Sequence, residues 1–328
     1  MAVTNKSVNL PVEYTTEIIR GVRGRSKALE LGRRLRDMRT KEMFLNVHKE
    51  LPVAGWVKNS RQTPNPEGTE INHKPIGQYA FEGVKVIAED LAVIIPYSED
   101  TIEDTEDFGI DTVADMTETV IDAFQQAIDL AALFGIDAPW ENYRGLVPEA
   151  TEKGAVVEWD GSTGPSFYFA ISEAMRYVEN SGYLPNAILG GPSILSAFRD
   201  SITDLGVNVT DQGEIGRLAR HVDLTGGFDY TSAFAIVGEF RYLVYSFRKD
   251  MTMKLLTEGV IQDPLTKEIL YNLGQEDMQA IRFVMRLGFA LPNPVNRVSG
   301  VLSSDGRYIS KGGQAYPFAV ITKTGASA

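Results

Sequence analysis

The chain has 328 residues, 43% of them hydrophobic, which is enough for one large or two ordinary domains with a sizeable core. It has no cysteine, so disulfides, a thiol nucleophile and a zinc-finger framework are excluded, and its net charge of −12 argues against a general binder of duplex DNA. No apolar run approaches the roughly 18 residues of a membrane span, and the N-terminus lacks a signal-peptide pattern, which indicates a cytosolic protein that does not enter a membrane.

Charge is distributed unevenly along the chain. Residues 1–50 contain 11 lysines and arginines against 6 acidic residues, whereas residues 98–150 contain 14 acidic residues and a single arginine, Arg144. Segments of opposite charge attract each other. We therefore expect the basic and the acidic segment to make contact, either within one subunit or between copies of the chain.

Residues 1–42 are basic and contain few apolar side chains, so we expect an arm that packs on something else. A helix is predicted around SKALELGRRLRDMRTKEM (26–43), where Ala28, Leu31 and Leu35 form one weak apolar stripe. Arginines cover the rest of its surface: Arg33, Arg34, Arg36 and Arg39.

Two runs with strand character follow, at 43–57 and 78–96, and the segment 58–77 between them is rich in proline, glycine and asparagine. This pattern predicts a long hairpin with a polar tip. A two-stranded ribbon is only marginally stable in water, and apolar residues such as Trp56 near its tip need cover from elsewhere. Another copy of the chain could supply that cover.

The stretch PYSEDTIEDTEDFGID (96–111) leads directly into the segment 112–134, whose apolar residues recur every three or four positions. This spacing predicts an amphipathic helix of about six turns. Thr112 and Asp115 form a plausible capping box at its start, and Gly135 is a natural stop.

Several roles are open for the acids that precede this helix. Calcium binding is one, because four residues occupy EF-hand positions, but Phe108 stands where an oxygen ligand belongs. Acid–base catalysis would need a desolvated cleft. The helix dipole favours acids only near the first turn, so a basic partner surface better explains acids as far back as Glu99. The EF-hand positions are Asp104, Glu106, Gly109 and Asp115.

A second module follows a loop over 135–165. We predict helices at 166–180 and 192–204, a buried strand at 186–191, a loop over 205–232, and long strands at 233–256 and 277–291 around a polar excursion. The predicted fold class is α+β with unusually long extensions.

Signatures of catalysis and cofactor binding are missing from the sequence. There is no GxSxG elbow, no Walker loop and no GxGxxG after a strand. The histidines His48, His73 and His221 lie far apart in the sequence, so each is interpreted as a surface or loop residue. No feature of the sequence favours an enzyme beyond the frequency of enzymes among proteins in general, and neither a metal nor a cofactor is expected.

The order of these features resembles the major capsid protein of tailed bacteriophages, which has the Hong Kong 97-type fold. The acidic lead-in and long helix correspond to the family's spine helix. AIVGEFRYLVYSFRKDMTMKLL (235–256) is similar to its peripheral-domain strand, with Gly238, Glu239 and Phe240 at the characteristic positions, and AIRFVMRLGFALPNP (280–294) is similar to the strand that returns to the axial domain.

The resemblance implies a domain organisation. Residues 1–42 would form the N-terminal arm, 43–96 the extended loop, 97–165 with 233–291 the peripheral domain, and 166–232 with 292–328 the axial domain. Such proteins assemble as pentamers and hexamers into an icosahedral head around double-stranded DNA, which they enclose without reading its sequence. We accordingly expect a structural protein of the virion, assembled in the cytoplasm of the host bacterium.

The resemblance also implies partners. We expect a separate scaffolding protein, a portal and in some heads a decoration protein. The acids before the spine helix are predicted to dock basic residues of a neighbouring subunit. The candidate contact residues are Arg20, Arg23, Arg33, Arg34, Trp56, Lys58, Arg61, Glu103, Asp104, Glu106 and Asp107.

Three alternatives stay open at this point. Some relatives join subunits by a Lys–Asn isopeptide bond, for which Lys58 or Lys74 with Asn272 are conceivable, although ordinary solvated tip residues are the favoured interpretation. The same fold occurs in encapsulins, bacterial shells that hold enzymes. A cytosolic α+β enzyme or binding protein is the third, and it predicts a small oligomer with one deep pocket.

Overall fold

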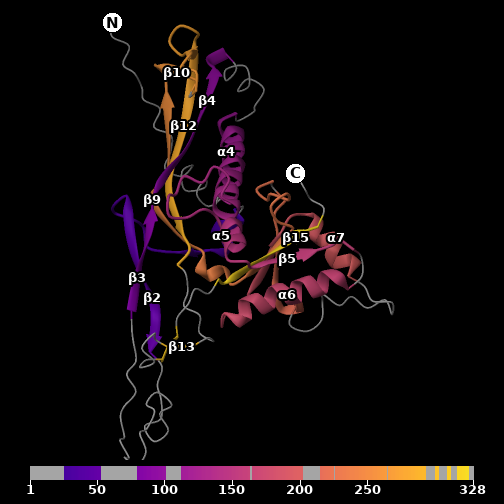
Figure 1. Ribbon diagram of the computed structural model, residues 1–328. Helices are drawn as coiled ribbons and strands as arrows, with labels where there is room; N and C mark the ends of the chain where they lie inside the picture. The colour runs from indigo at the N-terminus through magenta and orange to yellow at the C-terminus, as the bar shows by residue number, and fades with distance from the viewer. Residues whose placement is uncertain are drawn as a thin grey trace, which may run out of the picture.

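The computed structural model describes residues 26–52, 80–100, 112–162, 165–201, 215–224, 226–263, 265–292, 300–302, 309–311 and 316–324. Figure 1 shows an elongated molecule in which three regions extend from a common centre. A long sheet is lined by the helix α4, a second sheet lies beside the helices α6 and α7, and the hairpin β2–β3 projects away from both.

The long sheet has the strand order β1-β9-β12-β4, in which β12 (Met278–Ala290) runs antiparallel to both of its neighbours, β9 (Val244–Leu256) and β4 (Glu89–Ser98). The short strand β1 (Arg33–Arg34) pairs in parallel with β9. Alternate residues of β12 are buried, so one face of the sheet packs into the core while the other faces outward.

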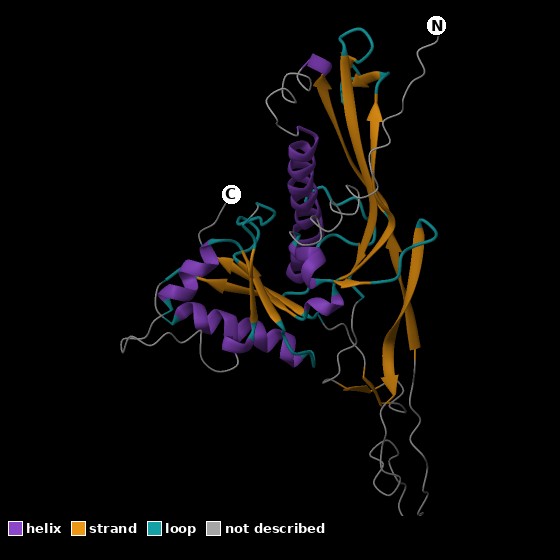
Figure 2. Ribbon diagram, turned by 180° about the vertical axis from the view of Figure 1, so that it is seen from behind, coloured by secondary structure: helices purple, strands orange, loops and turns teal. Residues whose placement is uncertain are grey.

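The helix α4 (Thr112–Asp129) covers the inner face of this sheet, as Figure 2 shows from behind. Its buried residues Val120, Phe124 and Ile128 belong to the same core cluster as Phe283 and Met285 of β12. A π-helical turn, Leu130–Phe134, extends α4, and Gly135 ends it with a φ of 72°. The predicted helix over 112–134 and its glycine stop are therefore confirmed.

The second sheet has the order β5-β15-β8-β6-β7. Along β6, Ile188 belongs to one core cluster whereas Ala187 and Leu189 belong to the other. Burial on both faces explains why β6 is an uninterrupted apolar run. Its strands are β5 (Val156–Trp159), β15 (Phe318–Lys323), β8 (Ala235–Gly238), β6 (Ala187–Gly190) and β7 (Ala219–Val222).

The helices of this region agree with the sequence prediction. α6 (Ser166–Asn180) has the predicted bounds, and α7 (Ser193–Asp200) begins directly after Pro192 but ends earlier than expected. The predicted loop over 205–232 contains a short 3₁₀ turn, Ile215–Arg217, and the strand β7, which the sequence analysis missed. A further helix, α5 (Leu146–Glu152), lies in the loop before β5.

The predicted strand over 78–96 is two strands in different sheets. β3 (Ala80–Ile87) pairs with β2 (Glu42–Pro52), and the chain then turns at Ala88 into β4 of the long sheet. At this crossing Gly288 of β12 approaches β3 so closely that a Cβ on it would lie 2.4 Å from the carbonyl oxygen of Ile87. The short strands β13 (Gly300–Leu302) and β14 (Ile309–Lys311) extend the β2–β3 sheet.

The predicted strand over 233–256 is also divided. β8 ends at Gly238, a 3₁₀ turn spans Phe240–Tyr242, and β9 begins in the other sheet. Hydrogen bonds to distant groups hold this turn: the N–H of Glu239 donates to the carbonyl of Pro317 at 3.0 Å, and the N–H of Phe240 to Asn186 Oδ1 at 3.1 Å. Because these partners lie far away in the sequence, the apolar run gave no local sign of a turn.

We expect the substitution Gly288→Ala to lower the free energy of unfolding by about 2 kcal/mol, because the added methyl group must displace the backbone of β3. Chemical denaturation of the unassembled protein measures this. Gly274→Ala is the matched control, since nothing lies within 4 Å of a Cβ built at Gly274. Equal stability of the two variants would contradict the close approach.

Candidate functional site

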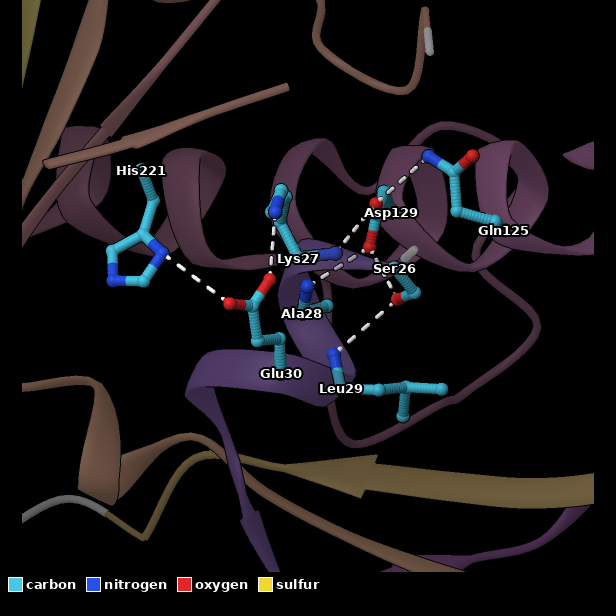
Figure 3. A network of polar contacts seen from close by, with 8 residues as sticks. All are labelled: Ser26, Lys27, Ala28, Leu29, Glu30, Gln125, Asp129 and His221. Carbon is cyan, nitrogen blue, oxygen red and sulfur yellow. Dashed lines mark hydrogen bonds and ion pairs between the residues drawn. The ribbon is translucent and has the colours of Figure 1, made fainter. Parts of the chain in front are cut away.

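The point where the arm joins the body is held by one buried carboxylate, that of Asp129 at the end of α4 (Figure 3). Asp129 Oδ1 accepts hydrogen bonds from the hydroxyl of Ser26 at 2.7 Å and from the N–H of Ala28 at 2.9 Å. Oδ2 accepts from the N–H of Lys27 at 2.9 Å and from Gln125 Nε2 at 3.2 Å. Four donors thus converge on one side chain that is completely shielded from solvent.

These bonds explain why a helix of only five residues, α2 (Lys27–Leu31), forms here. The first N–H groups of a helix lack partners within the helix. Ser26 caps one of them, the N–H of Leu29, and Asp129 satisfies two more from a distant part of the chain. A helix this short is not stable on local interactions alone.

Asp129 has an unusual ionisation. Burial raises its pKa from 3.8 to about 6, and the hydrogen bonds from Ser26, Ala28, Lys27 and Gln125 oppose that rise. Both oxygens are fully occupied as acceptors, so the carboxylate has no capacity left for a substrate or a metal ion. Its role is to hold the arm in place.

Beyond α2 the arm follows the edge of the long sheet. The N–H groups of Arg33, Leu35 and Met38 donate to carbonyls of residues 243, 245 and 247 at 2.7–2.8 Å. The helix predicted over 26–43 is therefore wrong after Leu31. Once the chain leaves α2 at Gly32, hydrogen bonds to the exposed edge of β9 replace those of a helix.

Two of the predicted contact residues lie in the described part of the arm. Arg34 is bound within its own chain: it pairs with Asp37 at 2.7 Å, which raises its pKa, and its guanidinium lies 5.2 Å from the centre of the Phe247 ring. Arg33 is exposed and makes no side-chain contact with any other described residue. The structure thus leaves Arg33, but not Arg34, available to a neighbour.

The remaining predicted contact residues lie outside the described residues, as do Lys74 and most of the proposed EF-hand segment. Asn272 is described and donates to Gln275 Oε1 at 2.8 Å. Within the described ranges, no group of three or more His, Cys, Asp or Glu side chains could hold a metal ion. The contact residues outside the description are Arg20, Arg23, Trp56, Lys58, Arg61, Glu103, Asp104, Glu106 and Asp107.

His48 lies on β2, where it is exposed as the interpretation as a surface residue implied, and His221 lies half-buried on β7. His48 stacks on Phe81, with ring centres 5.0 Å apart, and His221 Nδ1 lies 3.6 Å from Glu30 Oε1. Neither histidine neighbours a second histidine or a cysteine of the described chain in a metal-binding arrangement.

The sequence analysis missed an apolar surface at the far end of the long sheet (Figure 1). There the hairpin of β10 (Val260–Gln262) and β11 (Ile269–Asn272) forms a sheet of its own with two strands. Large exposed apolar patches mark interaction sites. We call this surface the apolar tip; its exposed residues are Val260, Leu265, Ile269, Leu270 and Tyr271.

A second exposed apolar surface lies on the hairpin β2–β3. Phe44 is 66% exposed and Phe81 57% exposed, and both flank Gly83 on one face of the ribbon. The Lys85 ammonium lies 6.0 Å from the centre of the Phe44 ring and pairs with Glu42. Phe44 and Phe81 lie in separate strand segments of the sequence, so only the pairing of β2 with β3 places them on one face.

A groove of about 430 Å³ separates α4 from the ends of β4 and β12. Its floor is apolar, with Ala127, Ala131 and Trp140 among the lining residues. Two of its three acids, Glu89 and Asp90, form ion pairs with Lys41 and Arg286.

Among the described helices, none is both long and apolar enough to cross a membrane.

Comparison with known proteins identifies relatives of this architecture. The model of the phage capsid family matches residues 7–296. A structure from Microbacterium phage Oxtober96 is 27% identical, with 91% of each chain covered and a TM-score of 0.70. A structure from Mycobacterium phage Cain is 24% identical, with 92% of this chain and 91% of the other covered and a TM-score of 0.74.

A more distant structure comes from the capsid of an empty GTA particle. It is 13% identical, covers 98% of this chain and 94% of its own, and has a TM-score of 0.54. No sequence among the curated proteins matches significantly. The predicted mixed helix-and-sheet fold with long extensions is confirmed by these likenesses.

The substitution Asp129→Asn is expected to lower the free energy of unfolding by about 2–4 kcal/mol at pH 7, because an amide nitrogen faces donors that the carboxylate oxygen accepted. Thermal and chemical unfolding measure the effect. Glu118→Gln, an exposed acid of the same helix, is the control and should change stability little.

The same pair of variants tests the raised pKa of Asp129. A carboxyl group whose pKa is higher in the folded state stabilises the fold most at low pH, and this contribution is lost as pH rises from about 4 to about 6. The gap between wild type and Asp129→Asn should therefore narrow across that interval. A gap that widens would show that the hydrogen bonds outweigh burial.

Proposed function

This chain belongs to the phage capsid family and is a structural major capsid protein that assembles into the shell of a virion, and we propose that it does so as pentamers and hexamers enclosing double-stranded DNA. The observation that supports this organisation is the elongated body with exposed apolar surfaces on its appendages. The hairpins β2–β3 and β10–β11 both present large apolar side chains that the described part of the chain leaves exposed.

Burial of these surfaces between copies would supply most of the assembly free energy. Each square ångström of apolar surface removed from water contributes about 25 cal/mol. Side chains such as Leu265, which is 89% exposed, therefore favour association strongly once they meet a complementary surface. The curved, closed shape of a shell requires every copy to use the same set of surfaces.

The arm is the proposed source of charged contacts. Asp129 fixes Ser26, the first described residue of the arm, at the end of α4. We propose that Arg20, Arg23 and Arg33 of the arm and Arg61 of the extended loop meet acids of a neighbouring subunit. Lys58 and Trp56 of the loop are proposed as further contacts with a neighbouring copy. Arg34 is a weaker candidate because Asp37 already binds it. The proposed acids are Glu103, Asp104, Glu106 and Asp107.

Further partners are proposed from the family alone: a separate scaffolding protein, a portal, in some heads a decoration protein, and assembly in the cytoplasm of a bacterial host. The proposed domain boundaries are those of the family. An encapsulin is not favoured, because the matching family and the similar structures are those of phage capsids.

The substitution Leu265→Asp should reduce the yield of shells several-fold without destabilising the subunit. Its backbone N–H bonds to Asp263 Oδ1 at 2.7 Å, so the turn does not depend on the side chain. Electron microscopy and light scattering measure assembly, and thermal unfolding measures the fold. Leu265→Met, which keeps the apolar surface, is the control. If Leu265→Asp formed shells in normal yield, the apolar tip would not be part of the interface between subunits.

Reversal of the four acids Glu103, Asp104, Glu106 and Asp107 to lysine is expected to abolish assembly at low salt, because the proposed docking surface would then repel arginines. A second variant that also carries Arg20→Glu and Arg23→Glu should recover part of the yield. Individual exposed pairs contribute only about 0–1 kcal/mol, so the effect depends on their repetition across the shell. Assembly that does not respond to the reversal would refute the docking hypothesis.

A further inference from the structure

The outward face of the long sheet carries two cations directly opposite each other. Arg282 of β12 pairs across the strands with Lys254 of β9, and both side chains are exposed. Directly opposed side chains on neighbouring strands have Cβ atoms only about 5 Å apart, and like charges in these positions repel each other. The subunit alone therefore gains nothing from this pair.

A second arginine on the same face of β12 is neutralised by an acid of the sheet. Four residues further along β12, Arg286 faces Asp90 of β4, and the two form an ion pair with Arg286 Nη2 2.7 Å from Asp90 Oδ2. At the equivalent place opposite Arg282, β4 presents Ile94, which is 42% exposed. Opposite Arg282 the sheet therefore carries an exposed apolar side chain and not an acid that would compensate its charge.

No compensating group comes from elsewhere in the described chain. The side chains of Lys254, Arg282 and the nearby Lys249 make neither a hydrogen bond nor an ion pair with any described residue. Two unpaired cations lie here beside an exposed isoleucine. A partner that complements this surface would present carboxylates and some apolar area.

An acidic surface lies on the other side of the same layer. α4 packs on the inner face of the sheet, and its outer side carries Glu118 and Asp122, within the segment 98–150 that contains 14 acidic residues against one arginine. The sheet separates these acids from Arg282 and Lys254. The two charged surfaces of one subunit therefore do not meet, although they are complementary between subunits.

We infer that the outward sheet face around Arg282, Lys254 and Ile94 binds the acidic outer side of α4 of a second copy. This inference rests on the proposed function and names a contact within it. A contact between two different surfaces of identical subunits is head-to-tail, and repetition of such a contact closes a ring when the rotation allows it. Ring-shaped capsomers are built in this way.

The substitution Arg282→Thr tests the inference with two readouts of opposite sign. Because it removes the repulsion, it should raise the melting temperature of the unassembled subunit by roughly 1–2 °C. Because it removes a contact between copies, it should raise the protein concentration needed for half-assembly by about two- to fivefold. Arg286→Thr is the control, since loss of its pair with Asp90 should not raise the melting temperature.

A charge exchange identifies the partner surface. Arg282→Glu with Lys254→Glu should prevent assembly, and addition of Glu118→Lys and Asp122→Lys to the same chain should restore it. Assembly of Arg282→Thr at the wild-type concentration would overturn the inference. So would a lowered melting temperature, which would place the partner within the same chain, or failure of the exchange to restore assembly.

Nucleic acid is the other polyanion in a filled head, so short duplex DNA is titrated into unassembled wild-type and Arg282→Thr protein. Binding that requires Arg282 would assign the face to DNA and overturn the contact between copies. If wild-type protein forms no shells under any condition, the proposed function itself fails. Normal shells from wild type and from Arg282→Thr alike would reject only this contact.

Discussion

The buried carboxylate of Asp129 is the interaction on which the arrangement of the arm depends. It lies at the end of α4, where the helix widens into a π-helical turn, and it gathers donors from Ser26, Lys27 and Ala28. Desolvation of a carboxylate is costly, and only several hydrogen bonds make it tolerable. These hydrogen bonds fix the position of the arm. From this point the chain continues through α2 and then through the strand β1 along the edge of β9.

The body divides its apolar residues between interior and appendages. β12 forms the centre of the long sheet and contributes Phe283, Met285 and Leu287 to the largest core cluster, which α4 covers from the inside. The hairpins at the two ends of the molecule cannot share this cover and expose phenylalanine, leucine and isoleucine instead. In a monomer such exposure is a liability, whereas in the assembly we propose a neighbouring copy would cover each appendage.

Sequence periodicity predicted the elements whose stability is local. The spacing of Val120, Phe124 and Ile128 was sufficient for α4, as were the apolar pattern of α6 and the uniform run of β6. Periodicity failed where contacts with distant residues determine the structure. The break at Ala88 depends on the close approach of Gly288, and the break at Glu239 depends on a hydrogen bond to Asn186. α2 ends early because the chain then pairs with the edge of β9. Of the predicted contact residues, Arg33 is available and Arg34 is engaged by Asp37, a partner three residues away that the sequence already contained.

The way the arm is fastened has a mechanical consequence for a shell. A pull on the arm at Ser26 would reach three hydrogen bonds, from Ser26, Lys27 and Ala28, that meet at a single side chain, so they would bear tension together and not fail one after another. Because that side chain ends α4, the force would pass into the helix and from there into the sheet behind it. Stretching of the arm between subunits would thus strain the body as a whole before it released the tether.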